Sequence, residues 1–256
     1  MDVLILGCGF TGRRVAERFI ARGAKVTVTT RDPQRLSDLD ARVIALSDVP
    51  KHVREGMLVL HSIPPEGSPG IADLLGETPA RVLYLSSTAV YGAANFVDEK
   101  SDVDWTSARA RPRLLEEECV AQGPWTSLIL RPPAIYGPGR GAHESVRRGT
   151  YVASENFVSR IHVDDLATHV EAGLLSSVCG AYPVADEDPA TTREVGEFCA
   201  QLLGLPDVPT EDSSRVVARR IMGNRQVDGS AIRRKLGITL AFPSYRVGIP
   251  AALSLP

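Results

Sequence analysis

Short apolar runs alternate with amphipathic or charged stretches along the first two thirds of the chain. The runs that predict strands span residues 3–6, 25–30, 43–46, 57–61, 81–86 and 127–131. Some are almost continuously apolar, as in 82–85, which is typical of strands covered on both faces. Helices are predicted over 13–22, 109–122, 163–175 and 192–203. This alternation predicts an α/β fold: a doubly wound parallel sheet with helices on both faces.

The first apolar run leads directly into Gly7-Cys8-Gly9-Phe10-Thr11-Gly12. Gly-x-Gly-x-x-Gly between a strand and a helix is typical of a Rossmann dinucleotide-binding turn. The tight turn needs Gly7, close approach of the backbone to a pyrophosphate needs Gly9, and close helix–strand packing needs Gly12. Free N–H groups and the dipole at the helix N-terminus favour phosphates. The residues expected to hold the pyrophosphate are Gly7, Gly9, Phe10, Thr11 and Gly12.

The alternation of strands and helices breaks in two places, which indicates a second unit. Residues 1–136 together with 161–180 are expected to form the Rossmann core. Residues 137–160 and 181–256 are expected to form a small substrate lobe, mostly C-terminal. In open α/β sheets, ligands bind outside the carboxyl ends of the strands, so the lobe is expected to fold onto that edge.

Composition narrows the class of protein and of partner. A net charge of −2 over 256 residues predicts no nucleic-acid partner and no membrane-surface partner. No apolar run approaches the roughly 18 residues of a membrane span, and the N-terminus does not resemble a signal peptide. The four cysteines are scattered without a C-x-x-C pair, which predicts reduced thiols, no metal site and a cytoplasmic location.

The end of the second predicted strand bears on the choice of cofactor. NAD sites usually carry an acidic residue about 20 residues beyond the glycines, where it bonds the ribose 2′-hydroxyl. This chain has Arg31 there, with Arg35 one helical turn further on. A guanidinium suits a 2′-phosphate because it makes paired, charge-assisted hydrogen bonds. We therefore predict that the cofactor is NADP. NAD is the alternative, because the acidic residue Asp32 is adjacent to Arg31. In another interpretation, Arg31 and Arg35 are solvated loop charges that bind no cofactor.

Four further segments stand in order along the chain: residues 85–92 (LSSTAVYG), 130–140 (LRPPAIYGPGR), 160–167 (RIHVDDLA) and 228–253. Together they resemble the extended short-chain dehydrogenase/reductase superfamily, the NAD(P)-dependent epimerase/dehydratase group. The resemblance covers essentially the whole chain. The chain departs from the group in being shorter than typical members and in having the glycine motif one residue shorter than Gly-x-x-Gly-x-x-Gly. It is therefore similar to a compact, atypical member.

The resemblance implies roles for several residues. Ser87 stands where the family places the serine or threonine that bonds the reacting oxygen, and strand-end capping is its alternative role. Thr88 and Ala89 replace the Asp-Glu pair of family dehydratases, which argues against sugar dehydration. Positions that would contact the cofactor are His61, Ser62, Ile63, Ser86, Pro132 and Ile135.

The family's catalytic pair is a tyrosine followed four residues later by a lysine, and here the aligned residues are Arg109 and Arg113. Arg113 can hold the nicotinamide ribose, whereas Arg109 is no ordinary base because guanidinium stays protonated. In the alternative interpretation, both arginines are solvated charges on the helix surface and form ion pairs with the glutamates at 116–118. Tyr91 is then the candidate for proton transfer, with a packing aromatic as its alternative role.

The sequence is consistent with two functions. In the first, the protein is an NAD(P)-dependent oxidoreductase or epimerase-like enzyme that transfers hydride on a small carbonyl or sugar-like substrate. Ser87, Tyr91 and Arg113 then have catalytic roles. The second is a dinucleotide-binding sensor or regulatory protein without turnover. A homodimer is a possible assembly. The basic residues 215, 219, 220 and 225 either meet an anionic substrate or form a solvated face.

Overall fold

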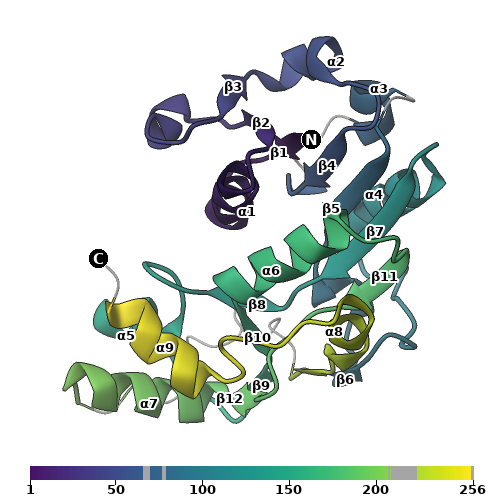
Figure 1. Ribbon diagram of the computed structural model, residues 1–256. Coiled ribbons are helices and arrows are strands. Elements are labelled where there is room, and N and C mark those ends of the chain that lie inside the picture. Colours follow the sequence, from purple (N-terminus) through teal and green to yellow (C-terminus); the bar gives the residue numbers. More distant parts are fainter. Residues whose placement is uncertain (66–69, 77–78, 207, 209–223, 255–256) are drawn as a thin grey trace.

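The central element of the computed structural model is a parallel sheet of seven strands (Figure 1). The structure describes residues 1–65, 70–76, 79–206, 208 and 224–254. The strands are β1 (Asp2–Leu6), β2 (Lys25–Thr29), β3 (Arg42–Ile44), β4 (Leu58–His61), β5 (Arg81–Leu85), β7 (Thr126–Arg131) and β11 (Gly180–Pro183). Their spatial order is β11-β7-β5-β4-β1-β2-β3. The order reverses between β1 and β4, and a crevice at such a switch point is where α/β sheets bind ligands.

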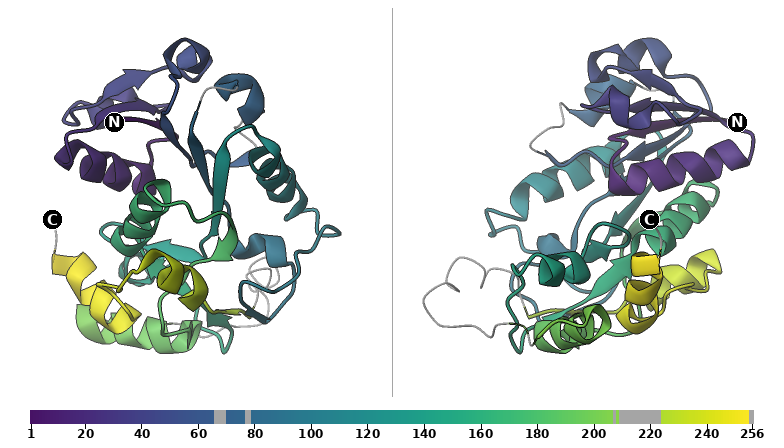
Figure 2. Two further views of the ribbon diagram at one scale, coloured as in Figure 1. Left: turned by 45° about the vertical axis from the view of Figure 1, so that its right-hand side comes forward. Right: turned by 90° about the vertical axis from the view of Figure 1, so that its left-hand side faces the viewer.

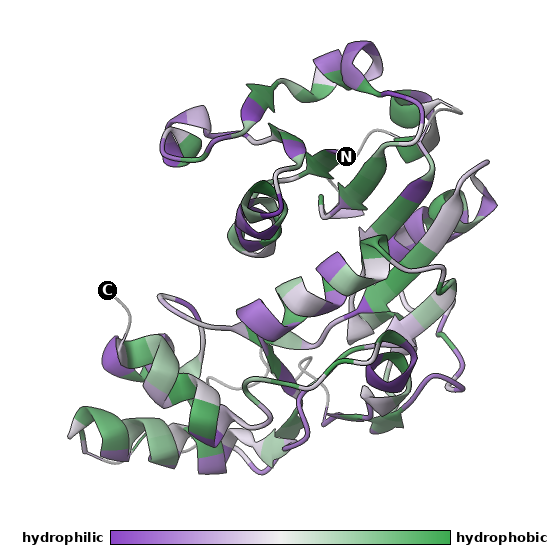
Figure 3. Ribbon diagram, viewed as in Figure 1, coloured by the Kyte–Doolittle hydropathy of each residue, from purple (hydrophilic) through white to green (hydrophobic). Residues whose placement is uncertain are grey.

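Helices cover both faces of the sheet, as the apolar strands require. On one face lie α1 (Phe10–Ala21) and α6 (Val163–Leu174), which pack against each other, and α8 (Ser230–Leu236) packs against α6. On the other lie α2 (Val49–His52), α3 (Ile71–Leu75) and α4 (Arg111–Gln122). Two apolar cores result, one on each side of the sheet, and Figure 3 shows the strands as its most continuously hydrophobic segments. The predicted α/β Rossmann class is therefore confirmed.

A smaller layer lies beyond the carboxyl ends of β5 and β7 (Figure 2). It holds α5 (Ala142–Arg147), α7 (Thr192–Leu203) and α9 (Tyr245–Ser254), which share an apolar core. Three two-stranded pairs surround it. The pairs are β8 (Ala134–Tyr136) with β10 (Arg160–His162), β9 (Phe157–Val158) with β12 (Ala190–Thr191), and β6 (Phe96–Val97) with β13 (Gln226–Val227).

Three-residue to four-residue 3-10 turns complete the connections between the elements. They are η1 (Pro33–Leu36), η2 (Leu46–Asp48) and η4 (Thr88–Tyr91). The third of these follows β5 and holds the segment after Ser87 at the carboxyl edge of the sheet. Across the described ranges, no helix is both long and apolar enough to cross a membrane.

Element boundaries follow local chemistry where the sequence carries a cap. The helix predicted at 192–203 begins and ends as expected, because Thr191 and Glu194 form a capping box and Gly204 takes the left-handed conformation at φ +63°. The strand predicted at 43–46 is shorter, because Leu46 starts the η2 turn. The last strand of the sheet, β11, spans residues 180–183 and so crosses the boundary expected between core and lobe at residue 180. The helix α8, expected in the lobe, packs against β11 and α6 of the core.

Candidate cofactor and substrate site

The turn between β1 and α1 shows why its three glycines differ. Gly7 has φ +87°, a left-handed conformation, and its N–H donates to Thr29 Oγ1 at 3.0 Å. At Gly12 an added Cβ would lie 2.6 Å from the Gly7 carbonyl oxygen, so only glycine lets α1 approach the turn this closely. At Gly9 an added Cβ would meet no heavy atom within 4 Å, so the backbone is open to a ligand.

A cavity of about 780 Å³ lies against this turn, and we call it the glycine-loop cavity. It is bounded by the turn, the end of β2 and the loop after β4. Predicted cofactor residues that line it are Gly7, Gly9, Phe10, Arg31, Arg35, Ser62 and Ile63. The Ser62 hydroxyl donates to the carbonyl oxygen of Gly7 at 2.7 Å, which fixes the β4 loop against the glycine turn.

The charges around the glycine-loop cavity are unevenly neutralised. Arg13 is paired with Glu17 at 2.9 Å and with Asp38 at 2.5 Å, and Arg14 is paired with Asp164 at 2.9 Å. Arg31 and Arg35 are exposed, and neither forms an ion pair with a carboxylate in the part of the chain that the structure describes. The first turn of α1 contains no acidic residue. The cavity therefore presents positive charge and free backbone N–H groups, which suits phosphates.

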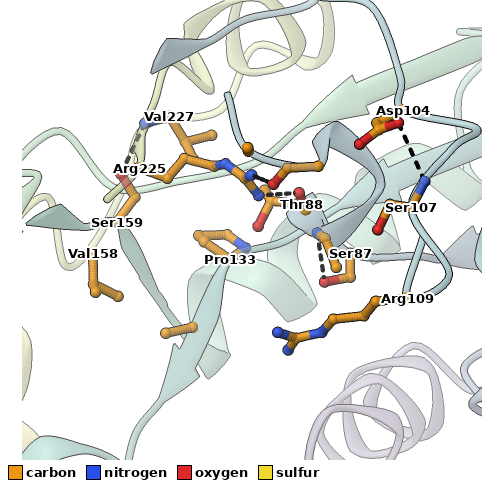
Figure 4. Close-up of a pocket in the computed structure, with 14 residues that line it drawn as sticks. Ser87, Thr88, Asp104, Ser107, Arg109, Pro133, Val158, Ser159, Arg225 and Val227 are labelled. Atoms are coloured by element: carbon orange, nitrogen blue, oxygen red, sulfur yellow. Dashed lines mark hydrogen bonds between the residues drawn. The ribbon is translucent and has the colours of Figure 1, made fainter. Parts of the chain in front are cut away.

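A second cavity, of about 570 Å³, lies at the carboxyl ends of β5 and β7, and we call it the β5–β7 cavity (Figure 4). Its lining includes Ser87, Arg109, Pro133 and Ser159. The Ser87 Oγ caps η4 by accepting the Ala89 N–H at 3.1 Å. This bond uses an oxygen lone pair, so the hydroxyl proton can still be donated to a substrate. In Figure 4 the Arg109 side chain extends alongside Ser87.

Arg225 forms one wall of the β5–β7 cavity and holds its loop in place. Its guanidinium donates to the carbonyl oxygens of Thr88, Gly92 and, at 2.9 Å, Ala94. Burial lowers the pKa of Arg225. Arg225, one member of the predicted basic run, therefore uses its guanidinium to bind backbone carbonyl oxygens of the η4 loop. The other three, Arg215, Arg219 and Arg220, lie outside the described residues.

Comparisons with known proteins agree with this geometry. A family model described as "NADP oxidoreductase coenzyme F420-dependent" matches residues 2–90. A Streptomyces 3-diazoavenalumate denitrifying reductase is 25% identical over 97% of this chain and 99% of its own length. A conserved protein of unknown function from Silicibacter pomeroyi superposes with a TM-score of 0.85 and 28% identity, covering 99% of this chain and 98% of its own. The human epimerase family protein SDR39U1, solved with NADPH, has a TM-score of 0.79 and 20% identity, covering all of both chains.

The chain has the fold of the extended short-chain dehydrogenase/reductase superfamily. The sequence resemblance aligns Arg109 and Arg113 with the superfamily's tyrosine and lysine. Arg109 just precedes α4 and lines the β5–β7 cavity, whereas Arg113 lies within it beside Tyr84. Burial raises the pKa of Tyr84, and the neighbouring Arg113 guanidinium opposes that effect. Arg113 is not part of the lining described for either cavity.

Tyr91 is not among the residues that line either cavity. Its ring is buried against the Arg131 guanidinium, 5.1 Å from ring centroid to Cζ, and its hydroxyl accepts from Arg131 Nη1 at 3.2 Å. Burial raises its pKa further from neutrality. Arg131 is paired in turn with Glu117 at 2.6 Å, and Ser86 Oγ donates to Glu117 at 2.5 Å. Tyr91 and Ser86 therefore belong to a buried network beneath the cavity, and the geometry favours a packing role for Tyr91.

Three other predicted contacts also lie beside the cavities rather than in their lining. The His61 side chain is fully buried, with Nε2 3.0 Å from Glu116 Oε1 and its ring stacked on Tyr84 at 4.7 Å. Pro132 is buried and its carbonyl accepts the Thr88 N–H, while Ile135 packs against the core. The lining residues at this turn are instead their neighbours Pro133 and Ala134. Among the residues described, no group of three or more potential metal ligands is placed to hold an ion.

Sequence reasoning did not assign Ser159 or Pro133 to the site, and it considered Arg225 only as one member of a basic run. Ser159 and Arg225 come together because β9, β13 and the η4 loop meet at the cavity: the Ser159 N–H donates to the Arg225 carbonyl, and Ser159 Oγ accepts the Val227 N–H at 2.8 Å. No local motif marks either residue. For Pro133 the signal is present, because the Pro132-Pro133 pair follows directly after β7, which ends at Arg131.

Proposed function

We propose that the protein binds NADP in preference to NAD and transfers hydride on a small carbonyl or sugar-like substrate. The observation that carries the proposal is the pair of cavities at the carboxyl edge of one sheet, with phosphate-binding features in the first and Ser87 with Arg109 in the second. Support comes from the NADPH in the solved human relative and from the reductase at 25% identity. We propose a cytoplasmic location on the cysteine pattern alone.

The preference for NADP rests on Arg31 and Arg35. Both line the glycine-loop cavity at the end of β2, where the adenosine ribose is expected, and neither is neutralised by a described carboxylate. Two guanidinium groups there would give a 2′-phosphate charge-assisted hydrogen bonds. Asp32 also lines the cavity and would repel that phosphate, so the preference is expected to be moderate.

The proposed chemistry assigns roles to two side chains of the β5–β7 cavity. The cofactor supplies or accepts the hydride when bound. During reduction, negative charge builds on the substrate oxygen, and Ser87 donates a hydrogen bond to that oxygen. The permanent charge of Arg109 stabilises the same oxygen electrostatically, which is the kind of preorganised stabilisation that lowers barriers most. Because guanidinium does not release its proton, the proton that completes the alcohol comes from solvent.

A direct test has a binding arm and a turnover arm. Fluorescence titration should give a lower Kd for NADPH than for NADH, and Arg31→Gln with Arg35→Gln should remove most of the difference. Tighter binding of NADH by the wild type would contradict the arginine argument. For turnover, loss of NADPH absorbance is followed with a panel of carbonyl compounds. Ser87→Ala should lower kcat and leave NADPH affinity unchanged.

A second candidate function is a dinucleotide sensor without turnover. The observation that favours it is the replacement of the superfamily's tyrosine and lysine by Arg109 and Arg113, together with the burial of Tyr91. This function predicts tight NADPH binding, protection of the protein against thermal unfolding, and no NADPH consumption with any member of a broad carbonyl panel. Turnover above the buffer rate that disappears in Ser87→Ala would exclude it.

A further inference from the structure

Phe10, the first residue of α1, is flanked by two arginines from different parts of the chain. Arg14 places its Cζ 4.6 Å from the ring centroid, and Arg140 places its Cζ at 5.2 Å. Arg140 comes from the turn between β8 and α5, in the smaller layer. That turn is fixed by backbone hydrogen bonds of 2.9 and 3.0 Å between Gly137 and Arg140, and an added Cβ at Gly137 would lie 3.3 Å from Phe10 Cζ. The turn therefore rests directly on the glycine loop.

The two arginines differ in what neutralises them. Arg14 is committed twice, to Asp164 at 2.9 Å and to the Phe10 carbonyl at 3.1 Å. Arg140 is exposed and forms no ion pair with any carboxylate among the described residues. Within the part of the chain that the structure describes, its guanidinium is held only by the face of Phe10, a weak contact of about 0.5–1 kcal/mol at an exposed site. A cation placed this way keeps its hydrogen-bond donors available beside the cavity that Phe10 lines.

We propose that Arg140 binds the pyrophosphate of the dinucleotide from the side of the smaller layer, facing the N–H groups of α1. The inference rests on the proposed dinucleotide binding. A pyrophosphate carries two negative charges, whereas the N-terminus of α1 offers only about half a positive charge. Arg13 and Arg14 are already neutralised, so Arg140 supplies the missing charge. Its planar fork also suits two phosphate oxygens at once.

This assignment gives the smaller layer a part in cofactor binding. Arg140 precedes α5, and α5 packs on α7, so a phosphate held by Arg140 links the cofactor to the layer beyond the sheet. The arginines thereby divide the ligand: Arg31 and Arg35 would recognise the 2′-phosphate, and Arg140 would recognise the pyrophosphate. That division can be measured, because ligands exist that carry one group without the other.

The test compares three ligands on four forms of the full chain. NADPH carries both groups, NADH carries the pyrophosphate only, and adenosine 2′-monophosphate carries the 2′-phosphate only. The forms are wild type, Arg140→Gln, Arg31→Gln and Arg148→Gln. Arg148 is a control because it is an exposed arginine of the same layer with equal charge. Kd values come from fluorescence titration for the dinucleotides and from competition against NADPH for the monophosphate.

We expect Arg140→Gln to raise the Kd values for NADPH and NADH by the same factor, about tenfold. Its Kd for adenosine 2′-monophosphate should equal that of the wild type, which also shows that the variant is folded. Arg31→Gln should do the reverse, weakening NADPH and the monophosphate but not NADH. If Arg140→Gln changes the dinucleotide Kd values no more than Arg148→Gln does, the assignment of Arg140 is wrong while dinucleotide binding stands. If the wild type binds neither dinucleotide, the proposed function and this inference both fail.

Discussion

The glycine loop predicts opposite outcomes for two substitutions that look alike in sequence. Gly12→Ala should destabilise the fold. An added Cβ would lie 2.6 Å from a backbone oxygen of Gly7 and 3.2 Å from Ile5 Cγ2, and neither atom sits at the end of a flexible side chain. Overpacking costs about 1–3 kcal/mol, and a clash with a rigid backbone oxygen belongs in the upper part of that range, about 2–3 kcal/mol. About 1 kcal/mol is recovered because alanine favours helix. The net loss should be about 1–2 kcal/mol, which lowers Tm by about 2–8 °C for a chain of this size.

Gly9→Ala should cost less stability than Gly12→Ala, because an added Cβ at Gly9 meets nothing within 4 Å and φ, at −95°, lies outside the left-handed region. The methyl group would instead stand beside the cavity that Gly9 lines and obstruct the pyrophosphate. We expect the Kd for NADPH to rise by about tenfold or more, ~1.4 kcal/mol. Thermal denaturation of both variants tests the predicted effects on stability, and NADPH titration of both variants tests the predicted effects on affinity. Unchanged NADPH affinity in Gly9→Ala, or an unchanged Tm in Gly12→Ala, would refute the division of roles.

Three further predictions concern buried charge. Burial raises the pKa of Asp186 to about 8, so the folded protein holds a proton that the unfolded chain releases above about pH 4. Stability should then fall as pH rises from about 4 to 8, and Asp186→Asn should flatten that fall in thermal melts. Arg225→Gln should speed hydrogen exchange of the η4 amides, since three carbonyl bonds are lost. Glu117→Ala should cost about 3–5 kcal/mol in urea denaturation because Arg131 stays buried without its partner. Arg13→Gln should cost far less, because its pairs with Glu17 and Asp38 are exposed to solvent.

The parts of the fold that could be predicted are those written in local pattern. Buried parallel strands are short and apolar, so all six predicted strands of the sheet are present to within one or two residues. The seventh strand, β11, was missed because its sequence Gly-Ala-Tyr-Pro is short and lies at the sheet edge, where packing is one-sided. α8 and α9 were missed for a related reason. Their stability comes from packing against α6 and α7, which no local periodicity reveals.

The charged helix α4 shows where sequence reasoning about the site reaches its limit. Its three consecutive glutamates suggested a solvated face paired with Arg109 and Arg113. In the structure Glu116 instead pairs with His61, and Glu117 pairs with Arg131 on β7. Both partners are distant in sequence, so the pairing follows from strand order alone. Burial of these charges is tolerated because each carboxylate finds a matching donor.

The lining of the β5–β7 cavity makes a last prediction about pH. Its titratable side chains, among the residues described, are Asp104, Arg109 and Arg225. Hydrogen bonds from Thr106 hold the pKa of Asp104 below its usual value, so this carboxyl does not change charge between roughly pH 5 and 9. Guanidinium groups are in general not proton donors in this window. A reaction that depends on Ser87 and Arg109 should therefore show kcat/KM that is flat across this window for a substrate that does not itself titrate. A bell-shaped profile with a pKa near neutrality would mean that a proton-transfer group acts here and that solvent is not the proton source.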